Sequence, residues 1–252
     1  MRLAIFSDIH GNPIALRAVL EDIEAAGGVD GYWALGDFSA IGYDPATIFD
    51  VLTNLPNRVM IKGNTDRYLL TGERPRPAIE AVVNDPSLMP IILEINTNFG
   101  WTVGYLAACG WLGWMDKLPT EARLTLPDGT RLLGVHASPK NDELGFDPEL
   151  TDDECRELLG DCQADVVVCG HTHQALERRV DGVHIVNVGN VSNPITADKR
   201  ASYVILEADE AGYRIEPRQV DYDSDIVMQT IRAVRHPAAA YLCSFYEKDK
   251  TS

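Results

Sequence analysis

The sequence predicts an α/β fold with one domain over residues 1–252. Strand-like runs alternate with helix-like segments through the first third of the chain, a spacing that favours right-handed crossovers and a parallel sheet. Later strand-like runs come in three close pairs, two of them around Asp-Gly turns, which predicts antiparallel hairpins. No repeat, low-complexity tract or linker divides the chain.

The first third begins with a strand in RLAIFSD, residues 2–8. Asn12 and Pro13 then form a cap and first-turn pair that opens a helix to about Ala26. The next expected elements are a strand in GYWALGD (31–37), a helix from about Pro45 to Leu55, and a strand in RVMIKGN (58–64).

The pattern changes between about residues 65 and 118, where we expect a helical insertion. ERPRP (73–77) ends a short helix, and we expect Asn96-Thr97 to form the N-terminal cap of a second helix. An apolar stripe at helical spacing follows, made of Trp101, Tyr105, Ala108, Leu112 and Met115. Such a stripe is typical of a packed helix face, and the alternative is a helix that covers an active site.

Strands resume after the insertion. ARLTL (122–126) and RLLGVHAS (131–138) flank the turn PDGT, and a helix from Thr151 to about Gly160 precedes a strand in DVVVCG (165–170). The remaining expected elements are a hairpin of ALERRV (175–180) and VHIVNV (183–188), a hairpin of SYVILEA (202–208) and YRIEPRQVDY (213–222), and a helical tail from about residue 223.

Composition limits the classes of function. The chain has 22 basic and 38 acidic side chains, a net charge of −16, which disfavours binding to long nucleic acids and anionic membranes. The N-terminus has only four apolar residues before Ser7, too few for a signal peptide, so we expect a cytosolic protein without a membrane span. Five cysteines without a C-x-x-C pair indicate reduced, mostly buried thiols.

Side chains that bind metals follow five of the expected strands. They are Asp8 and His10, Asp37, Asn64, His136, and His171 with His173. In open α/β sheets functional groups gather beyond the carboxyl ends of strands, and a strand-end H-x-H can direct two imidazoles at one point. Each residue alone could be a cap, a turn residue or a buried histidine, but all seven together favour a metal centre. His184 and His236 lie outside this pattern, and we expect no metal role for them.

Seven candidate ligands exceed what one tetrahedral zinc needs and suit two metals that share a carboxylate. Imidazole, carboxylate and amide oxygen together favour Mn, Fe, Zn or Ni over Ca or Mg. Two such ions can bind a phosphoryl oxygen and an attacking hydroxide at the same time. The expected cofactor is therefore a pair of divalent transition-metal ions.

The motifs DIHGN, GD, GN, VH and GHTH, in that order between Asp8 and His173, resemble those of the calcineurin-like metallophosphoesterase superfamily. The compact length and the form GNTD (63–66) are most similar to its small bacterial and archaeal phosphodiesterase branch. The resemblance implies a four-layer sandwich of two mixed β-sheets flanked by helices. It also implies one metal held by Asp8, His10, Asp37 and His173, and a second held by Asn64, His136, His171 and the bridging Asp37.

The function implied is hydrolysis of small phosphodiesters, with a metal-bridging hydroxide as the nucleophile. The residues expected to be catalytic are Asp37, Asn64 and His136, and those expected to contact the phosphate are Asn12, Asn64 and Arg67. Together with Arg67, Arg74 and Arg76 could add a basic rim to the site, although solvated surface arginines are at least an equal interpretation.

One departure from the family pattern bears on the substrate. In the phosphomonoesterase and protein-phosphatase branches a histidine that is thought to protonate the leaving group follows the motif asparagine, and here this position is Thr65. A phosphomonoesterase or phosphoprotein phosphatase is therefore the alternative function. A second alternative is a non-catalytic metal-binding scaffold, although such relatives usually lack ligands and none of the seven is missing here. The sequence carries no signal for an oligomeric state.

Overall fold

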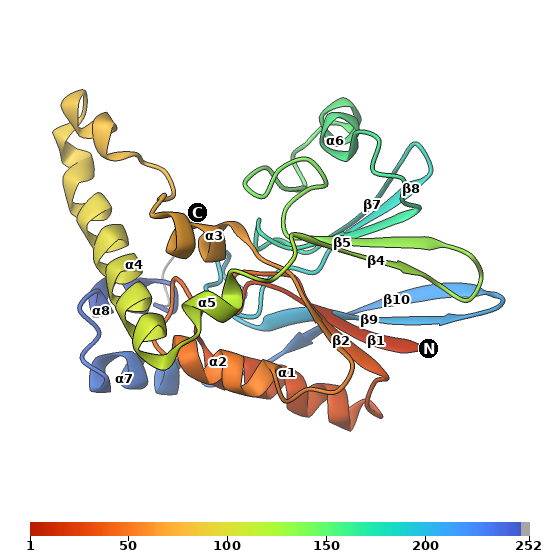
Figure 1. Cartoon of the computed structure of the whole chain (residues 1–252), viewed down its shortest axis with the longest axis horizontal. Coiled ribbons are helices and arrows are strands. Elements are labelled where there is room, and N and C mark those ends of the chain that lie inside the picture. Colours follow the sequence, from red (N-terminus) through yellow and green to blue (C-terminus); the bar gives the residue numbers. More distant parts are fainter. Residues whose placement is uncertain (248–252) are drawn as a thin grey trace.

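The computed structural model describes residues 1–247 as two five-stranded sheets that pack face to face between layers of helices (Figure 1). The strands are β1 (Arg2–Phe6), β2 (Gly31–Ala34), β3 (Arg58–Met60), β4 (Glu121–Thr125), β5 (Arg131–Val135), β6 (Val166–Cys169), β7 (Leu176–Val180), β8 (Val183–Asn187), β9 (Ala201–Asp209) and β10 (Gly212–Val220). The helices are α1 (Pro13–Ala25), α2 (Pro45–Leu52), α3 (Asn64–Thr71), α4 (Met89–Cys109), α5 (Leu112–Met115), α6 (Asp152–Leu159), α7 (Ser224–Ala233) and α8 (Ala239–Ser244), with short 3-10 helices at Ile79–Val83 and Pro86–Leu88.

Both sheets are mixed. The first has the order β10-β9-β1-β2-β3, in which β1, β2 and β3 are parallel and β9 pairs antiparallel with β1. The second has the order β4-β5-β6-β8-β7, in which β5, β6 and β8 are parallel. The three predicted hairpins are present as β4–β5, β7–β8 and β9–β10. The four-layer sandwich is therefore confirmed.

Capping side chains set the starts of α1 and α6, and the sequence predicted the first of these caps. The Asn12 side chain accepts a hydrogen bond from the Ala15 N–H at 3.1 Å, and Pro13 follows it in the first turn of α1. Thr151 and Glu154 form a reciprocal capping box at the start of α6. These local bonds satisfy N–H groups that a helix leaves unpaired at its first turn.

The predicted start of the second helix in the insertion is wrong. Helix α4 begins at Met89, with Pro90 in its first turn, and Asn96 lies inside the helix, where its side-chain amide donates to the Ile92 carbonyl at 2.9 Å. The predicted apolar stripe does not lie on one helix. Helix α4 ends before Gly110, which has a left-handed conformation, and Leu112 and Met115 belong to α5. The face that α4 buries carries Ile92, Ile95, Asn98, Phe99, Thr102 and Leu106.

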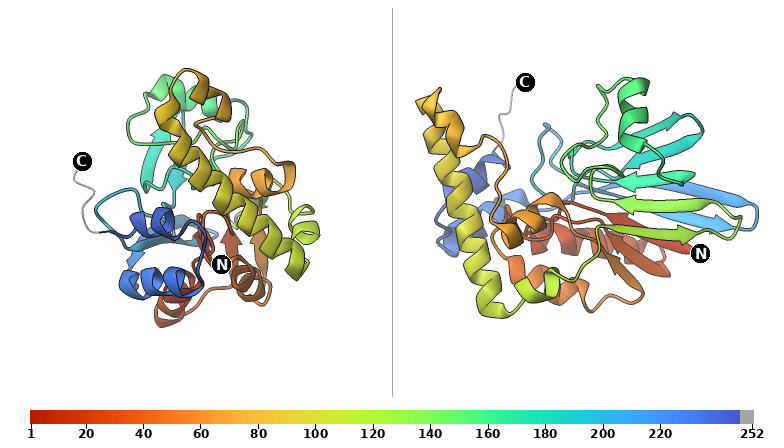
Figure 2. Two further views of the ribbon diagram at one scale, coloured as in Figure 1. Left: turned by 90° about the vertical axis from the view of Figure 1, so that its left-hand side faces the viewer. Right: turned by 45° about the horizontal axis from the view of Figure 1, so that its top comes forward.

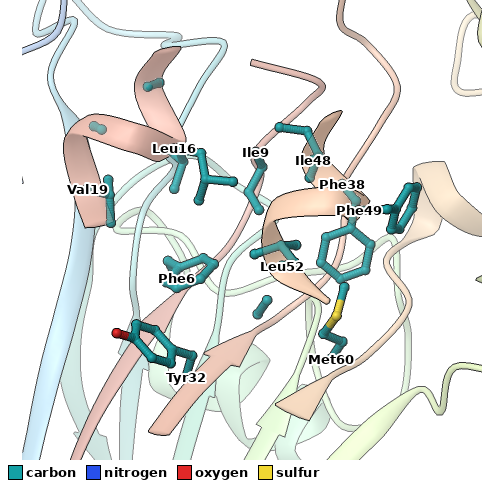
Figure 3. Packing of buried hydrophobic residues seen from close by; sticks show 14 of the residues in the cluster. Phe6, Ile9, Leu16, Val19, Tyr32, Phe38, Ile48, Phe49, Leu52 and Met60 are labelled. Carbon is teal, nitrogen blue, oxygen red and sulfur yellow. The ribbon is translucent and has the colours of Figure 1, made fainter. Parts of the chain in front are cut away.

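Three apolar layers hold the sandwich together. Helices α1 and α2 cover the outer face of the first sheet, where Phe6, Leu16 and Phe49 are fully buried (Figure 3). Between the sheets, Ile5 and Trp33 belong to the same buried cluster as Val166, Val168 and Val186. Helix α6 packs on the outer face of the second sheet through Cys155 and Leu159. The hydrophobic effect thus fixes both sheets relative to each other and leaves their strand ends to position a site.

The C-terminal helices α7 and α8 lie beside α4 rather than against either sheet (Figures 1 and 2). The His236 ring contacts the Trp101 ring of α4, with centroids 4.3 Å apart. All five cysteines are free thiols and four of them are buried, as predicted. Within residues 1–247 no helix is both long enough and apolar enough to cross a bilayer.

Candidate metal centre

The seven predicted ligand residues converge at one place, beyond the ends of β1, β2, β3, β5 and β6. His171 and His173 are partly buried, and the other five are buried. Five of the seven have a left-handed backbone although none is glycine, with φ between 46° and 71°: Asp8, His10, Asp37, His171 and His173. Such conformations cost free energy and persist where the surrounding structure enforces them, which is typical of functional sites.

The first group of candidate ligands surrounds the Asp8 carboxylate. The Nε2 atom of His173 lies 3.2 Å from Asp8 Oδ1, and the Nε2 atom of His10 lies 3.7 Å from the same oxygen. The two Nε2 atoms are 3.1 Å apart. This group matches the first set of ligands that the motifs implied, apart from Asp37.

The second group surrounds the Asn64 side-chain oxygen. Asn64 Oδ1 lies 2.8 Å from His136 Nε2 and 3.1 Å from His171 Nδ1, and these two ring nitrogens are 3.2 Å apart. Asp37 lies between the two groups, with Oδ2 at 3.9 Å from His10 Nε2 and Oδ1 at 3.4 Å from His136 Nε2. Its two oxygens therefore face different groups.

The four histidines are oriented by backbone carbonyls outside the site. In each ring one nitrogen contacts a carbonyl oxygen: His10 Nδ1 with Ala40, His136 Nδ1 with Leu35 at 2.8 Å, His171 Nε2 with Glu143 at 2.9 Å, and His173 Nδ1 with Asn193 at 2.8 Å. A nitrogen that donates to a carbonyl leaves the other nitrogen of a neutral ring as a lone pair. All four lone pairs then face the centre, so the donor set fits metal ions.

The charges of the site also favour a bound cation. Burial, followed by repulsion from Asp8, raises the pKa of Asp37 well above its usual value. Burial lowers the pKa of His10 to about 3 and that of His171 to about 4, so both rings are neutral at physiological pH. Two overlapping sets, Asp8–His10–His173 and Asp8–Asp37–His136, have ligand atoms close enough together to hold an ion. Positive charge at these sets would stabilise the buried carboxylates in their ionised form.

Glycines allow the loops to approach this closely. A Cβ atom on Gly63 would lie 2.1 Å from Asp37 Oδ1, and a Cβ atom on Gly170 would lie 2.4 Å from Asp8 Oδ2. No larger residue fits either position without displacing a candidate ligand.

Asp66 is a functional candidate that the seven-residue set did not include. Its carboxylate accepts hydrogen bonds from the N–H groups of Asp37 at 2.8 Å, Phe38 at 3.1 Å and Gly63 at 2.9 Å. It thereby ties the loop after β2 to the loop after β3. The available signal was its place in GNTD, at a helix N-terminus where a carboxylate can accept backbone N–H groups.

The predicted phosphate contacts have other partners in this structure. Asn12 is fully buried, and its amide contacts Tyr43, Ser192 and Tyr246 in addition to capping α1. The guanidinium of Arg67 makes two bonds to Asp142, at 2.7 and 2.9 Å, and further bonds to the Glu143 and Glu73 carboxylates.

The predicted basic rim has no counterpart at the centre. Arg74 lies over the Phe99 ring, 5.0 Å from the ring centroid, and donates to the Tyr68 and Glu73 carbonyls. Arg76 is an exposed residue of the same loop.

A pocket of about 550 Å³ lies between α3, the loop that follows it and α4. Tyr68 and Glu143 line it. Burial, then hydrogen bonding to Glu143, raises the pKa of Tyr68 to about 12, against an opposing effect of Asn64. The pocket wall thus includes Glu143, whose backbone carbonyl contacts His171.

Comparisons with known proteins agree with this geometry. The profile of the calcineurin-like phosphoesterase superfamily domain matches residues 1–211. The uncharacterized protein MJ0912 of Methanocaldococcus jannaschii is 26% identical over 243 residues, which cover 88% of each chain. A metallophosphoesterase structure from Sphaerobacter thermophilus is 25% identical, with a TM-score of 0.72 over 97% of this chain and 99% of that one.

A hypothetical protein from Pyrococcus horikoshii has a TM-score of 0.80 over 99% of both chains, and at 17% identity this likeness concerns the fold alone. The profile match covers most of the chain and includes every candidate ligand. The protein therefore belongs to the calcineurin-like phosphoesterase superfamily.

Proposed function

We propose that this protein hydrolyses small phosphate diesters with the help of two divalent transition-metal ions, chosen from Mn, Fe, Zn and Ni. The observation that carries the proposal is the orientation of four imidazoles, each held by a backbone carbonyl so that its free nitrogen faces the centre. Membership of the phosphoesterase family supports the same conclusion.

Each residue of the centre has a proposed role. One ion would be held by Asp8, His10 and His173, the other by Asn64, His136 and His171, and Asp37 would be shared by both. When bound, such ions supply Lewis acidity that polarises a phosphoryl oxygen and makes water nucleophilic at neutral pH. Asp37, Asn64 and His136 remain the proposed catalytic residues, because they lie where the two groups of ligands meet.

Two of the expected phosphate contacts have a better proposed role as supports. The amide of Asn12 already has protein partners on both its oxygen and its nitrogen. Arg67 holds the 142–143 segment, whose Glu143 carbonyl orients His171. Removing Arg67 from three carboxylates to bind a phosphate would break several charge-assisted bonds, so we assign it to positioning.

The preference for diesters rests on Thr65 and on the pocket. Thr65 is buried, and its hydroxyl donates to the Ala40 carbonyl at 3.0 Å, so it offers no acid at the position where the monoesterase branches have histidine. The pocket beside Tyr68 and α4 provides space for the organic group of a substrate. The net charge of −16 opposes long polyanions, so we propose small diesters rather than DNA.

The test is a comparison of matched substrates. Metal-free protein would be reloaded with Mn²⁺, Fe²⁺, Zn²⁺ or Ni²⁺ and assayed with bis(p-nitrophenyl) phosphate, p-nitrophenyl phosphate and duplex DNA, with Asp37→Asn as the inactive control. We expect the small diester to have the highest kcat/KM. Faster hydrolysis of the monoester would favour the phosphatase alternative. Two bound metals without turnover of any ester would favour the scaffold.

A further inference from the structure

The C-terminal segment, residues 223–247, places the Tyr246 side chain beside the loops that support the candidate metal centre. We propose that Tyr246 is a positioning residue that holds the His10 and His173 side of this centre. The inference rests on the proposed two-metal function and adds to it a part of the chain that lies beyond the family match, which ends at residue 211.

The Tyr246 hydroxyl lies in a buried polar network. It donates to Asn193 Oδ1 at 3.0 Å, lies 2.7 Å from Ser192 Oγ, and accepts from the Asn12 amide at 3.3 Å. The residue is 3% exposed. A buried hydroxyl with three polar partners fixes their relative positions, because the loss of any bond leaves a desolvated group unpaired.

Asn193 connects this hydroxyl to both imidazoles of the first ligand group. Its carbonyl accepts from His173 Nδ1 at 2.8 Å, and its side-chain amide donates to the Ile41 carbonyl at 2.8 Å. The neighbouring carbonyl, that of Ala40, contacts His10 Nδ1. One asparagine therefore ties together the two loops that orient His10 and His173.

Ser192 extends the connection to the third ligand of this group. Its N–H donates to the Asp8 carbonyl at 3.0 Å, while its hydroxyl contacts Tyr246 and accepts from the Asn12 amide at 3.0 Å. The loop of Ser192 and Asn193 is thus the common support of Asp8, His10 and His173, and Tyr246 is the side chain that holds both residues of this loop.

Apolar packing keeps Tyr246 in place. Val227 and Ile231 of α7 and Leu242 and Cys243 of α8 form one buried cluster with Tyr246 and with Tyr43, which follows β2. The segment is consequently anchored independently of the polar network. Loss of the Tyr246 hydroxyl alone should change the network and leave this packing intact.

The variant Tyr246→Phe tests the proposal, and Tyr222→Phe is its matched control. The Tyr222 ring packs against the Tyr246 ring with centroids 6.5 Å apart, but its buried hydroxyl has no hydrogen-bond partner within residues 1–247. Both variants remove one buried phenol oxygen from the same cluster. Co²⁺ would be titrated into metal-free protein, with visible absorption and elemental analysis as readouts.

We expect the wild type and Tyr222→Phe each to bind two Co²⁺ ions, and the affinities of the variant to equal those of the wild type. In Tyr246→Phe one of the two ions should bind about 10–100-fold more weakly, the range measured for residues that orient metal ligands, with a changed absorption spectrum. Asn193→Gly, which keeps the carbonyl and tolerates the left-handed φ of 55°, should give a similar loss. The double variant should be little weaker than either single one, because both break the same connection.

Identical Co²⁺ affinities for wild type and Tyr246→Phe would overturn this inference while leaving the two-metal proposal intact. Independent, additive losses in the double variant would also overturn it, because they would show that Tyr246 does not act through Asn193. Failure of the wild type to bind Co²⁺ would overturn the proposed function and this inference together. If Tyr246→Phe proved unstable in its metal-free form, Asn193→Gly would be titrated instead. Weaker binding of one Co²⁺ would support the inference, and unchanged affinity would overturn it.

Discussion

The Nε2 atoms of His10 and His173 lie 3.1 Å apart, and the other nitrogen of each ring contacts a backbone carbonyl. If both Nδ1 atoms donate to these carbonyls, two lone pairs face each other within a buried site. A shared proton or a cation must separate them. The carboxylate oxygen of Asp8 lies close to both rings, and this makes a metal ion the better match for the donor set.

The first prediction concerns metal content. We expect about two equivalents of metal per chain after reconstitution, because the two groups of ligands are distinct and share Asp37. His173→Ala should reduce this to about one, measured by elemental analysis after gel filtration. His184→Gln is the control, since His184 bonds Glu177 and Tyr213 away from the centre and its loss should leave two equivalents. A wild-type content of one or zero would contradict the dinuclear site.

The second prediction concerns Asp37, which faces both groups of ligands. Substitution of a residue that only orients a metal ligand typically lowers metal affinity or activity by about 10–100-fold. The loss of a bridging charge in Asp37→Asn should therefore lower kcat/KM by more than about 100-fold. Circular dichroism should show an intact fold. Asp8→Asn is the comparison and should have a milder or similar effect, because we assign Asp8 to one ion. Wild-type turnover by Asp37→Asn with both metals bound would show that Asp37 is not the bridge.

The third prediction follows from the Thr65 hydroxyl, which is a weak acid and donates to the Ala40 carbonyl. General acid catalysis typically contributes about 10²–10⁴ in rate, and without it the leaving oxygen carries its charge through the transition state. We therefore expect kcat/KM to depend steeply on leaving-group pKa, with aryl diesters cleaved much faster than alkyl diesters. The measurement is a series of diesters that differ only in the leaving alcohol.

Thr65→His supplies the control for this series. A shallower dependence in the variant would place the missing proton donor at position 65. A nearly flat dependence in the wild type would show that another acid acts in the site.

The fourth prediction concerns stability and pH. Burial lowers the pKa of His236 from 6.5 to about 4, and its Nδ1 accepts from the Ala238 N–H at 3.0 Å. The folded protein therefore binds this proton less tightly than the unfolded chain, so the contribution of His236 to stability is complete above about pH 6.5 and decreases as the pH falls toward 4.

His236→Gln removes this titration and serves as the comparison. From pH 7.5 to 4.5, the free energy of unfolding of the metal-free wild type should fall by about 1–3 kcal/mol more than that of the variant, since one pKa unit corresponds to about 1.4 kcal/mol. Urea unfolding at each pH provides the measurement. An equal loss in both proteins would contradict the expectation.

Local signals in the sequence were enough to predict most elements. Asn12 with Pro13 and Thr151 with Glu154 start their helices through bonds to residues within one turn, and the Asp-Gly turns join strands that are adjacent in the chain. The predicted start of α4 was wrong because asparagine is a common N-cap residue, which made Asn96 the expected cap. Its side chain instead bonds the Ile92 carbonyl within a helix that packing stabilises along a different face.

The sequence by itself determined which side chains follow the strands, and parallel strands bring their carboxyl ends to one edge, so the convergence of these side chains could be predicted before any contact was known. Only the tertiary structure decided what surrounds it. Arg67 meets Asp142, and Tyr246 meets Asn12, across 75 and 234 residues of chain. No local pattern encodes such pairs, because they depend on how whole layers pack. The supports of the centre therefore became visible only in the folded chain.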